Sequence, residues 1–375
     1  MKLHRHIHHH SKRNPLLSLV AVAATASLVA LIFTSGATIL AQARSIFLEL
    51  ESGSRTNVTQ KTSSNASGGK YVQFSNGSDS TPAPDPEPEP DPDPDPDPGC
   101  SGTNCIDGVE KPGPHNTGPT NESALGPMYE TLRIETPGTV IENVDMIGAR
   151  IDIRASNVTV RNFRVDGGGT YYGVQVRKDL SNVVIENGEI TNFSSAGVYC
   201  QSECTIRRTH IHDSSADGMK ISATNGQSLI EKNFVTRLGM NEGSHADGNQ
   251  SVSGNNLVFR YNNFFMPYPG TAAHDTLPRP PGVTAFRSNA TFIIHDGTDN
   301  ILIEKNWLVG GNYTIYGNEG TVVRNNVFGR DNADSPDITG GNGDGSKRLC
   351  NGPFDDWSGN IWTDGTPAKN NTTCP

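Results

Sequence analysis

The sequence predicts an all-β fold, a parallel β-helix, in which short strands wind into a solenoid of eight or more coils with three strands each. Three observations favour it. One short motif occurs eight times between residues 141 and 328, its period is mostly near 20 to 25 residues, and apolar residues occupy the same positions in every copy. These are properties of solenoid proteins, whereas helical repeats need roughly 33 residues or more.

Each copy of the motif contains two apolar residues five positions apart. The first residues, which we call the anchors, are Ile141, Val160, Ile185, Ile206, Ile230, Phe259, Ile303 and Val323. Their partners are Met146, Val165, Ile190, Ile211, Val235, Phe264, Leu308 and Phe328. Three positions after the anchor, the last four copies have Asn233, Asn262, Asn306 and Asn326. We expect these residues at a tight turn in the left-handed conformation, which Asn tolerates.

A third strand is expected before several motifs, over residues 172–176, 196–200, 217–221 and 247–251. Alternation of side chains along these strands predicts which residues point into the solenoid: Val174, Val176, Val198, Met219 and Ile221. The same alternation points Gln175, Tyr199, Lys220 and Gln250 outward. Because parallel coils stack about 4.8 Å apart, these four residues should form one outer column on successive coils.

The N-terminal region, residues 1–43, is interpreted as a signal peptide or an N-terminal membrane anchor. It begins with basic residues, continues with an uncharged apolar stretch over residues 16–40, and ends in Ala41-Gln42-Ala43, which suits signal peptide cleavage. The apolar stretch is also long enough to span a membrane. Either interpretation predicts an extracellular location for the remainder, secreted or anchored at the cell surface.

Two further segments precede the predicted solenoid. Residues 44–80 form a flexible segment in which residues 47–51 and 66–74 resemble opening strands of jelly-roll carbohydrate-binding modules. Residues 81–99 alternate Pro with Asp or Glu, a composition typical of a stiff, extended linker. Seven linker acids supply most of the formal net charge of −10. Since no basic stripe accompanies them, the composition excludes nucleic acid as a partner.

Six cysteines lie in the predicted β-helix domain, residues 100–375, as three close pairs. The pairs are Cys100 with Cys105, Cys200 with Cys204, and Cys350 with Cys374. An even number of cysteines behind an export signal predicts disulfide bonds, with a metal site as the alternative.

The repeated columns, the Asn turn and the three strands per coil resemble the right-handed parallel β-helix of the pectate-lyase-like superfamily, over residues 130–330. That superfamily includes polysaccharide lyases, polygalacturonase-type hydrolases, uronate epimerases and non-catalytic surface proteins, so the fold alone does not define the function. The resemblance implies a right-handed solenoid and a substrate cleft along the outer column and the loops that lead into it. Two of these loops, residues 236–246 and 266–290, are long and are expected to form a wall of that cleft.

Asp217 and Asp247 are the first candidate site residues, because each directly precedes a Gly at the start of a neighbouring strand. Two carboxylates stacked about 4.8 Å apart repel, so that one pKa should rise or a Ca²⁺ ion should bind both. The spacing also suits the carboxylate pair of a retaining glycosidase. The alternative is that Asp-Gly only shapes the turn.

Lys220 and His245 are the candidate bases or acids, Lys220 in the outer column and His245 in the long loop before Asp247. Their alternatives are a solvated surface lysine and a turn residue. His210 and His212, on either side of Ile211, should also point outward, with His212 beside Asp213. Arg177 and Arg237 could each hold a substrate carboxylate through two hydrogen bonds, or be surface charges.

These residues predict an exported, monomeric polysaccharide lyase that acts on a uronate-containing polymer. Lys220 or His245 would remove the proton α to the carboxylate, and Ca²⁺ at Asp217 and Asp247, or Arg237, would neutralise the carboxylate. The residues expected to line sugar subsites are Gln175, Tyr199, Gln250 and Tyr268. A glycoside hydrolase that uses the Asp pair is the second interpretation and a uronate epimerase the third. The alternative from another class is a non-catalytic surface β-helix that binds glycans or other cells.

Overall fold

The computed structural model describes residues 58–62, 70–74, 100–267, 269–295, 297–311, 313–329 and 354–368. The chain divides into two compact units, residues 1–89 and 90–375. In the first unit, strands β1 (Val58–Thr62) and β2 (Lys70–Phe74) pair antiparallel. The interpretations made for residues 1–43, 47–51 and 81–99 concern segments outside the described residues. Among the described residues, no helix is both long and apolar enough to cross a membrane.

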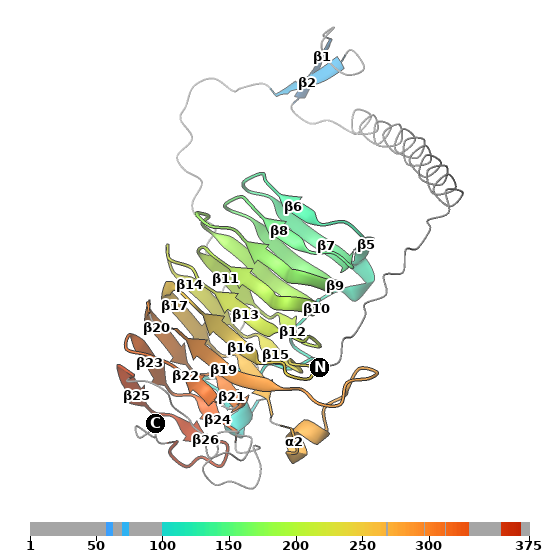
Figure 1. Ribbon diagram of the computed structural model, residues 1–375. Helices are drawn as coiled ribbons and strands as arrows, with labels where there is room; N and C mark the ends of the chain where they lie inside the picture. The colour runs from blue at the N-terminus through green and yellow to red at the C-terminus, as the bar shows by residue number, and fades with distance from the viewer. Residues whose placement is uncertain are drawn as a thin grey trace, which may run out of the picture. The chain divides into compact units, whose positions relative to one another are not determined.

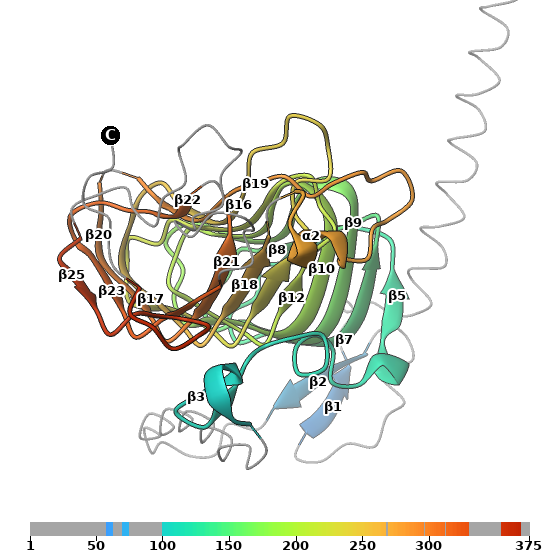
Figure 2. The same ribbon diagram turned by 90° about the horizontal axis from the view of Figure 1, so that it is seen from below.

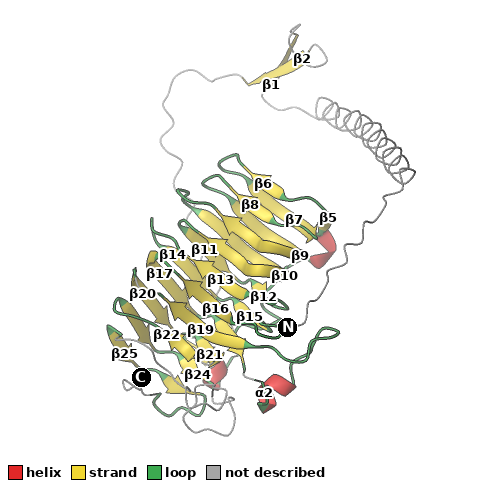
Figure 3. Ribbon diagram, in the orientation of Figure 1, coloured by secondary structure: helices red, strands yellow, loops and turns green. Residues whose placement is uncertain are grey.

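The second unit contains one continuous sheet, strands β5 to β26, in which all strand pairs are parallel (Figures 1 and 3). The sheet winds into coils with three faces, and the first face presents the predicted outer column. Its strands are β6 (Leu132–Ile134), β8 (Ile151–Ile153), the ends of β9 (Thr159–Val176) and β10 (Val183–Cys200), β13 (Asp217–Ile221), β16 (Ala246–Ser251), β19 (Ser288–Ile294) and β22 (Tyr313–Tyr316).

The other two faces follow in chain order along each coil. The second face consists of the starts of β7 (Val140–Ile147), β9 and β10, then β11 (Cys204–Arg207), β14 (Ser228–Glu231), β17 (Gly254–Arg260), β20 (Thr298–Glu304), β23 (Thr321–Arg324) and β25 (Asp356–Ser358). The third face consists of β5 (Gly126–Met128), the later parts of β7, β9 and β10, then β12 (His210–Ile211), β15 (Phe234–Thr236), β18 (Asn263–Met266), β21 (Trp307–Gly310), β24 (Val327–Phe328) and β26 (Ile361–Trp362).

The eight anchors stack in register on the second face, which confirms the predicted β-helix. Each anchor pairs with the anchor of the next coil, from Ile141 with Val160 to Ile303 with Val323. All except Ile141 are fully buried, as are the partner residues five positions later. Burial of such a side chain stabilises the fold by roughly 1.5–3 kcal/mol, so the stacked columns supply the core that no single coil could form.

The expected role of the repeated asparagines was wrong in its detail. The left-handed residues are those one position earlier, Lys232, Tyr261, Lys305 and Asn325. Asn233, Asn262, Asn306 and Asn326 are instead fully buried, and each side-chain amide donates to the amide oxygen of the next coil, at 2.9 to 3.0 Å, ending at Asn360. Asn suits this ladder because its side chain both donates and accepts, so each coil satisfies the next.

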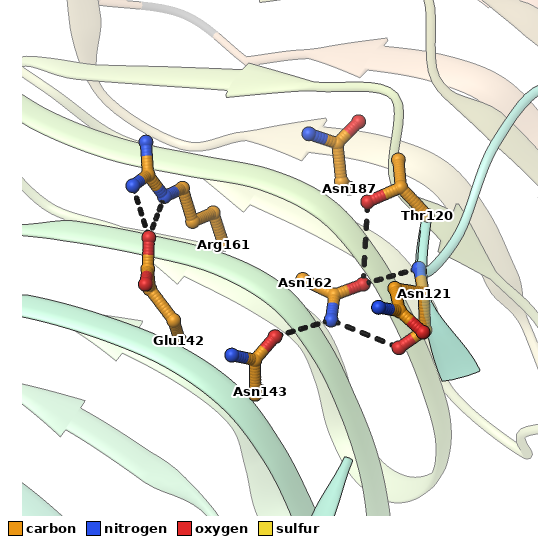
Figure 4. A pocket seen from close by; sticks show the side chains of 7 residues that line it. All are labelled: Thr120, Asn121, Glu142, Asn143, Arg161, Asn162 and Asn187. Carbon is orange, nitrogen blue, oxygen red and sulfur yellow. Dashed lines mark hydrogen bonds and ion pairs between the residues drawn. The ribbon is translucent and has the colours of Figure 1, made fainter. Parts of the chain in front are cut away.

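The N-terminal part of the domain runs along the outside of the third face (Figure 2). It contains two short 3₁₀ turns (Gly102–Asn104 and Glu122–Ala124) and the antiparallel pair β3 (Cys105–Ile106) and β4 (Val109–Glu110). Asn263 Nδ2 donates to Pro112 O at 2.7 Å, and Gly118 N donates to Arg208 O at 3.0 Å. Figure 4 shows its far end, where Asn162 Oδ1 accepts from Asn121 N at 2.9 Å. No sequence pattern predicted this covering segment.

Two of the three predicted disulfides are confirmed. Cys100 is bonded to Cys105, and Cys200 is bonded to Cys204 at a turn between the first and second faces. Cys350 and Cys374 lie outside the described residues, so their predicted bond stays a prediction.

Candidate functional site

The predicted outer column exists on the first face. Asp152, Gln175, Tyr199, Lys220 and Gln250 occupy the same register position on successive coils. The inward residues that alternate with them are fully buried, as predicted. Gln175 itself is also buried. Arg150 Nη1 donates to its Oε1 at 3.3 Å, and its Nε2 donates to Gln201 Oε1 at 3.4 Å, so both ends of its side-chain amide are paired within the protein.

Lys220 is held between two oxygen atoms near the middle of this column. Its Nζ lies 3.1 Å from Asp217 Oδ2 and 3.2 Å from Ser195 Oγ. The side chain of Lys220 is 22% exposed, compared with 11% for that of Asp217. The amine is thus fixed in direction but still accessible from the solvent side of the first face.

Asp217 and Asp247 are brought together, as the repeated Asp-Gly predicted. Asp217 Oδ1 accepts a hydrogen bond from Asp247 N at 2.9 Å, and Asp247 Oδ1 accepts from Asn289 Nδ2 at 3.0 Å. Burial raises the pKa of Asp217, against the lowering effect of the Asp247 amide and Lys220. Burial and, next, the charge of Asp217 raise the pKa of Asp247 well above its usual range. The pair therefore holds a proton more readily than two surface carboxyl groups, and Asp247 is the more strongly shifted member.

Sequence reasoning missed Tyr172 and Ser195, which complete this cluster, and Arg150, which contacts Gln175 in the same outer column. The rings of Tyr172 and Tyr199 lie 4.8 Å apart, and Ser195 hydrogen-bonds to Tyr172 as well as to Lys220. Burial, followed by the neighbouring Tyr171 and Tyr199, raises the pKa of Tyr172, so its hydroxyl keeps its proton. The sequence does contain a signal for Tyr172. Like Asp217, it directly precedes a Gly, and the two residues occupy the same register position two coils apart.

Several predicted site residues do not join this cluster. His245 is exposed in its loop. Arg237 lies on the third face and donates to both oxygens of Asp213, at 2.7 and 2.8 Å. Arg177 likewise donates to both oxygens of the buried Asp152, at 2.7 and 3.0 Å. These two guanidinium groups are already paired with carboxylates of the protein. Tyr268 lies outside the described residues.

The two long loops lie against each other at the start of the first-face strands. Arg287 N donates to Gly239 O at 2.9 Å, and Met240 N donates to Ser214 O at 3.2 Å. Gly239 has a φ of 75°, and a side chain there would meet the backbone of Arg287. The second loop carries the short helix α2 (Ala272–Asp275) and projects from the solenoid (Figure 1). Asn289, near the end of this loop and at the start of β19, connects it to Asp247.

Comparison with known proteins supports the fold. Residues 131–273 match a family described as "Right handed beta helix region". Together with the stacked parallel coils, this match defines the protein as a right-handed parallel β-helix, as the resemblance to the pectate-lyase-like superfamily implied. No curated protein sequence matches the chain.

Two solved structures are similar at low identity. An alginate lyase from Paenibacillus sp. str. FPU-7 is 9% identical with a TM-score of 0.28, over 64% of this chain and 87% of that one. A GH136 lacto-N-biosidase from Eubacterium ramulus is 12% identical with a TM-score of 0.24, over 61% of this chain and 53% of that one. The chain thus spans about half the length of the second protein. Likeness at this level assigns no activity, so the function is argued from the cluster on the first face.

Proposed function

We propose that this protein is an exported enzyme that cleaves a uronate-containing polysaccharide by β-elimination at the first face. The observation that supports it best is the position of Lys220, whose amine lies 3.1 Å from Asp217, a carboxyl group with a raised pKa. Ser195 links Lys220 to Tyr172, whose ring lies 4.8 Å from that of Tyr199, and Arg150 contacts Gln175 in the same outer column. A surface made only for adhesion needs no such convergence of titratable groups.

Lys220 serves as the base once it has lost a proton. Asp217 is the acceptor for that proton, because burial makes its protonated form easier to reach than that of a surface carboxylate. The free amine then takes the proton α to the substrate carboxylate. The electron pair of that C–H bond forms a double bond between the α and β carbons, and the bond from the β carbon to the glycosidic oxygen breaks.

Tyr172 supplies the proton that the leaving oxygen needs. Its raised pKa keeps the hydroxyl protonated in the resting enzyme, and its link to Ser195 positions it beside Lys220. After cleavage Lys220 is an ammonium again, Asp217 is protonated and Tyr172 is a phenolate. Transfer of the Asp217 proton to Tyr172 through solvent restores the starting state, so the cycle consumes no further reactant.

The substrate carboxylate must be neutralised to acidify its α proton. Arg150 is the first candidate for this charge, because its guanidinium contacts Gln175 Oε1 at 3.3 Å and lies no closer than 3.9 Å to the carboxylate of Asp152. Ca²⁺ at Asp217 and Asp247 is the second candidate for this charge. That ion would have to displace Lys220 from Asp217 Oδ2, and for this reason we favour Arg150.

The test is to incubate the protein with a panel of uronans and to follow the ultraviolet absorbance of the unsaturated product together with reducing ends. Both signals should rise together on at least one polymer. Lys220→Ala should abolish them, whereas Lys178→Ala, an exposed lysine on the turn after β9, should not. Reducing ends without new absorbance would indicate hydrolysis by the Asp pair. If neither signal appears on any polymer, the enzyme proposal is wrong and the glycan-binding interpretation replaces it.

A further inference from the structure

A second polar cluster lies on the third face, where strand β12 stacks on β10. His210 and Glu189 occupy the same register position on these two strands, as do Ile211 and Ile190. Because Ile211 points into the core, His210 and His212 both point outward, as predicted, and their ring centroids lie 3.9 Å apart. Glu189, His210 and His212 each offer one ligand atom, and these atoms lie within 4.8 Å of one another.

His210 provides an independent sign that this cluster receives a ligand. The residue is only 6% exposed, and its Nε2 is buried with no hydrogen-bond partner among the described residues. Leaving a buried polar atom unpaired costs about 1–3 kcal/mol. The ring stacks on Phe234 at 4.8 Å, which explains its orientation but leaves its nitrogen unsatisfied. A metal ion would satisfy that nitrogen through its lone pair.

The other two ligands are held in place from behind. Asp213 Oδ2 lies 2.8 Å from His212 Nδ1, and Arg164 Nε donates to Glu189 Oε2 at 2.8 Å. A carboxylate behind a ligating histidine and a hydrogen bond on the far carboxylate oxygen are common supports of metal sites. Arg237 Nη2 lies 2.7 Å from the same His212 nitrogen, and its positive charge would repel a bound cation. Asp213 offsets that charge, because Arg237 Nη2 also donates to Asp213 Oδ2 at 2.8 Å.

We propose that Glu189, His210 and His212 bind one divalent transition-metal ion of the Zn²⁺ type. Two imidazoles and one carboxylate suit Zn²⁺ and its neighbours, whereas Ca²⁺ and Mg²⁺ prefer sets made of oxygen ligands. The ion lies between His212 Nε2 and Glu189 Oε1, which are 3.0 Å apart without it, and it displaces the proton that they share. Three protein ligands leave a fourth position for water. The site is on a different face from Lys220, so its test does not depend on polysaccharide cleavage.

The experiment is titration of the full-length, chelator-treated protein with ZnCl₂, followed by calorimetry and by the melting temperature. The five histidines between His4 and His10 bind metal themselves, so they are replaced by alanine in every protein that is compared. We expect the parent protein to bind about one equivalent of Zn²⁺ more than its His210→Phe variant, and to melt at a higher temperature with Zn²⁺ but not with Mg²⁺. Phe preserves the stacking on Phe234 and removes both nitrogens. The matched control, His115→Ala, removes an exposed histidine and should bind Zn²⁺ as the parent does.

Equal Zn²⁺ stoichiometry in the parent and in His210→Phe would overturn the proposal. If His210→Phe does not fold, the proposal is tested on the parent protein alone by adding Co²⁺. A four-coordinate Co²⁺ site of this kind gives intense visible absorption, which Zn²⁺ removes by competition. Absence of that absorption would show that Glu189, His210 and His212 form only an ion-pair network.

Discussion

Lys220 Nζ lies 3.1 Å from Asp217 Oδ2, across three residues of strand β13. One strand thus brings an amine into contact with a buried carboxyl group whose pKa is raised. Lys220→Ala is expected to lower kcat/KM on the responsive uronan by about 10²–10⁴-fold, the usual contribution of a positioned base. Circular dichroism and melting temperature should stay close to those of the parent protein. An unchanged rate in a folded variant would remove Lys220 from the mechanism.

Asp217→Asn tests the proposed proton acceptor separately from the base. Without that carboxylate, Lys220 can lose its proton only to solvent, so the pH–rate profile of kcat/KM should shift to higher pH and the rate near neutrality should fall. The measurement is the complete profile on one polymer for both proteins. A lowered rate with an unshifted profile would give Asp217 a positioning role only.

Asp247 makes stability depend on pH in the direction opposite to that of an ordinary acid. Its pKa in the folded protein is raised above 3.8, so its contribution to the free energy of unfolding is complete below pH 3.8 and is lost as pH rises through the folded value. Each unit of raised pKa corresponds to about 1.4 kcal/mol. Asp247→Asn should therefore be more stable than the parent protein at pH 8, with a smaller difference at pH 4. Urea unfolding at a series of pH values measures this, and equal differences throughout would contradict it.

Asp152 behaves in the opposite way, although it is also buried. Burial raises the pKa of its carboxyl group, but hydrogen bonds from Arg177 and Arg154 outweigh burial and leave the pKa below 3.8. Its contribution to stability is thus present above pH 3.8 and lost as pH falls through the folded pKa. Arg177→Ala should destabilise the protein by about 1–3 kcal/mol at pH 7 and by less at low pH. Lys178→Ala, the exposed neighbour, is the control and should change little.

The asparagine ladder predicts a large effect from one buried amide. Asn262 donates to Ile230 O and Asn306 Oδ1, and its own oxygen accepts from the backbone and the side chain of Asn233. Asn262→Ala should destabilise the protein by roughly 2–4 kcal/mol, because partners on two coils become unsatisfied. The exposed Asn255→Ala on β17 should cost less than about 0.5 kcal/mol. If Asn262→Ala and Asn255→Ala lose the same free energy of unfolding in chemical denaturation, then the asparagine ladder does not stabilise these turns.

Chelation separates the two sources of positive charge at the first face. If Arg150 neutralises the substrate carboxylate, then activity in EGTA should equal activity in added Ca²⁺, and Arg150→Ala should lose most of it. Arg150→Lys should restore activity only in part, because an ammonium cannot form the paired contacts of a guanidinium. A loss in EGTA that Ca²⁺ reverses would assign this charge to a cation at Asp217 and Asp247.

The coils, their three strands and the inward and outward assignment of residues such as Val198 and Tyr199 were all predictable. These properties follow from local periodicity, because side chains alternate on a strand and apolar columns must stack to be buried. The Asp217 and Asp247 pair was predictable for the same reason, since both precede a Gly at equivalent positions of adjacent coils. The left-handed residue was placed one position too late, because a buried Asn and an exposed turn Asn look alike in a sequence.

Periodicity alone was enough to define the solenoid and the column that includes Lys220. Three-dimensional packing decided which charged side chains are paired within the protein. The reason is that hydrogen bonds depend on the distance between side chains of different coils, and not on their spacing in the chain. It paired Arg237 with Asp213, put Ser195 between Lys220 and Tyr172, and left His210 with an unsatisfied nitrogen next to Glu189. Contacts of this kind depend on the direction and burial of each side chain, and neither can be deduced from the neighbouring residues in the sequence.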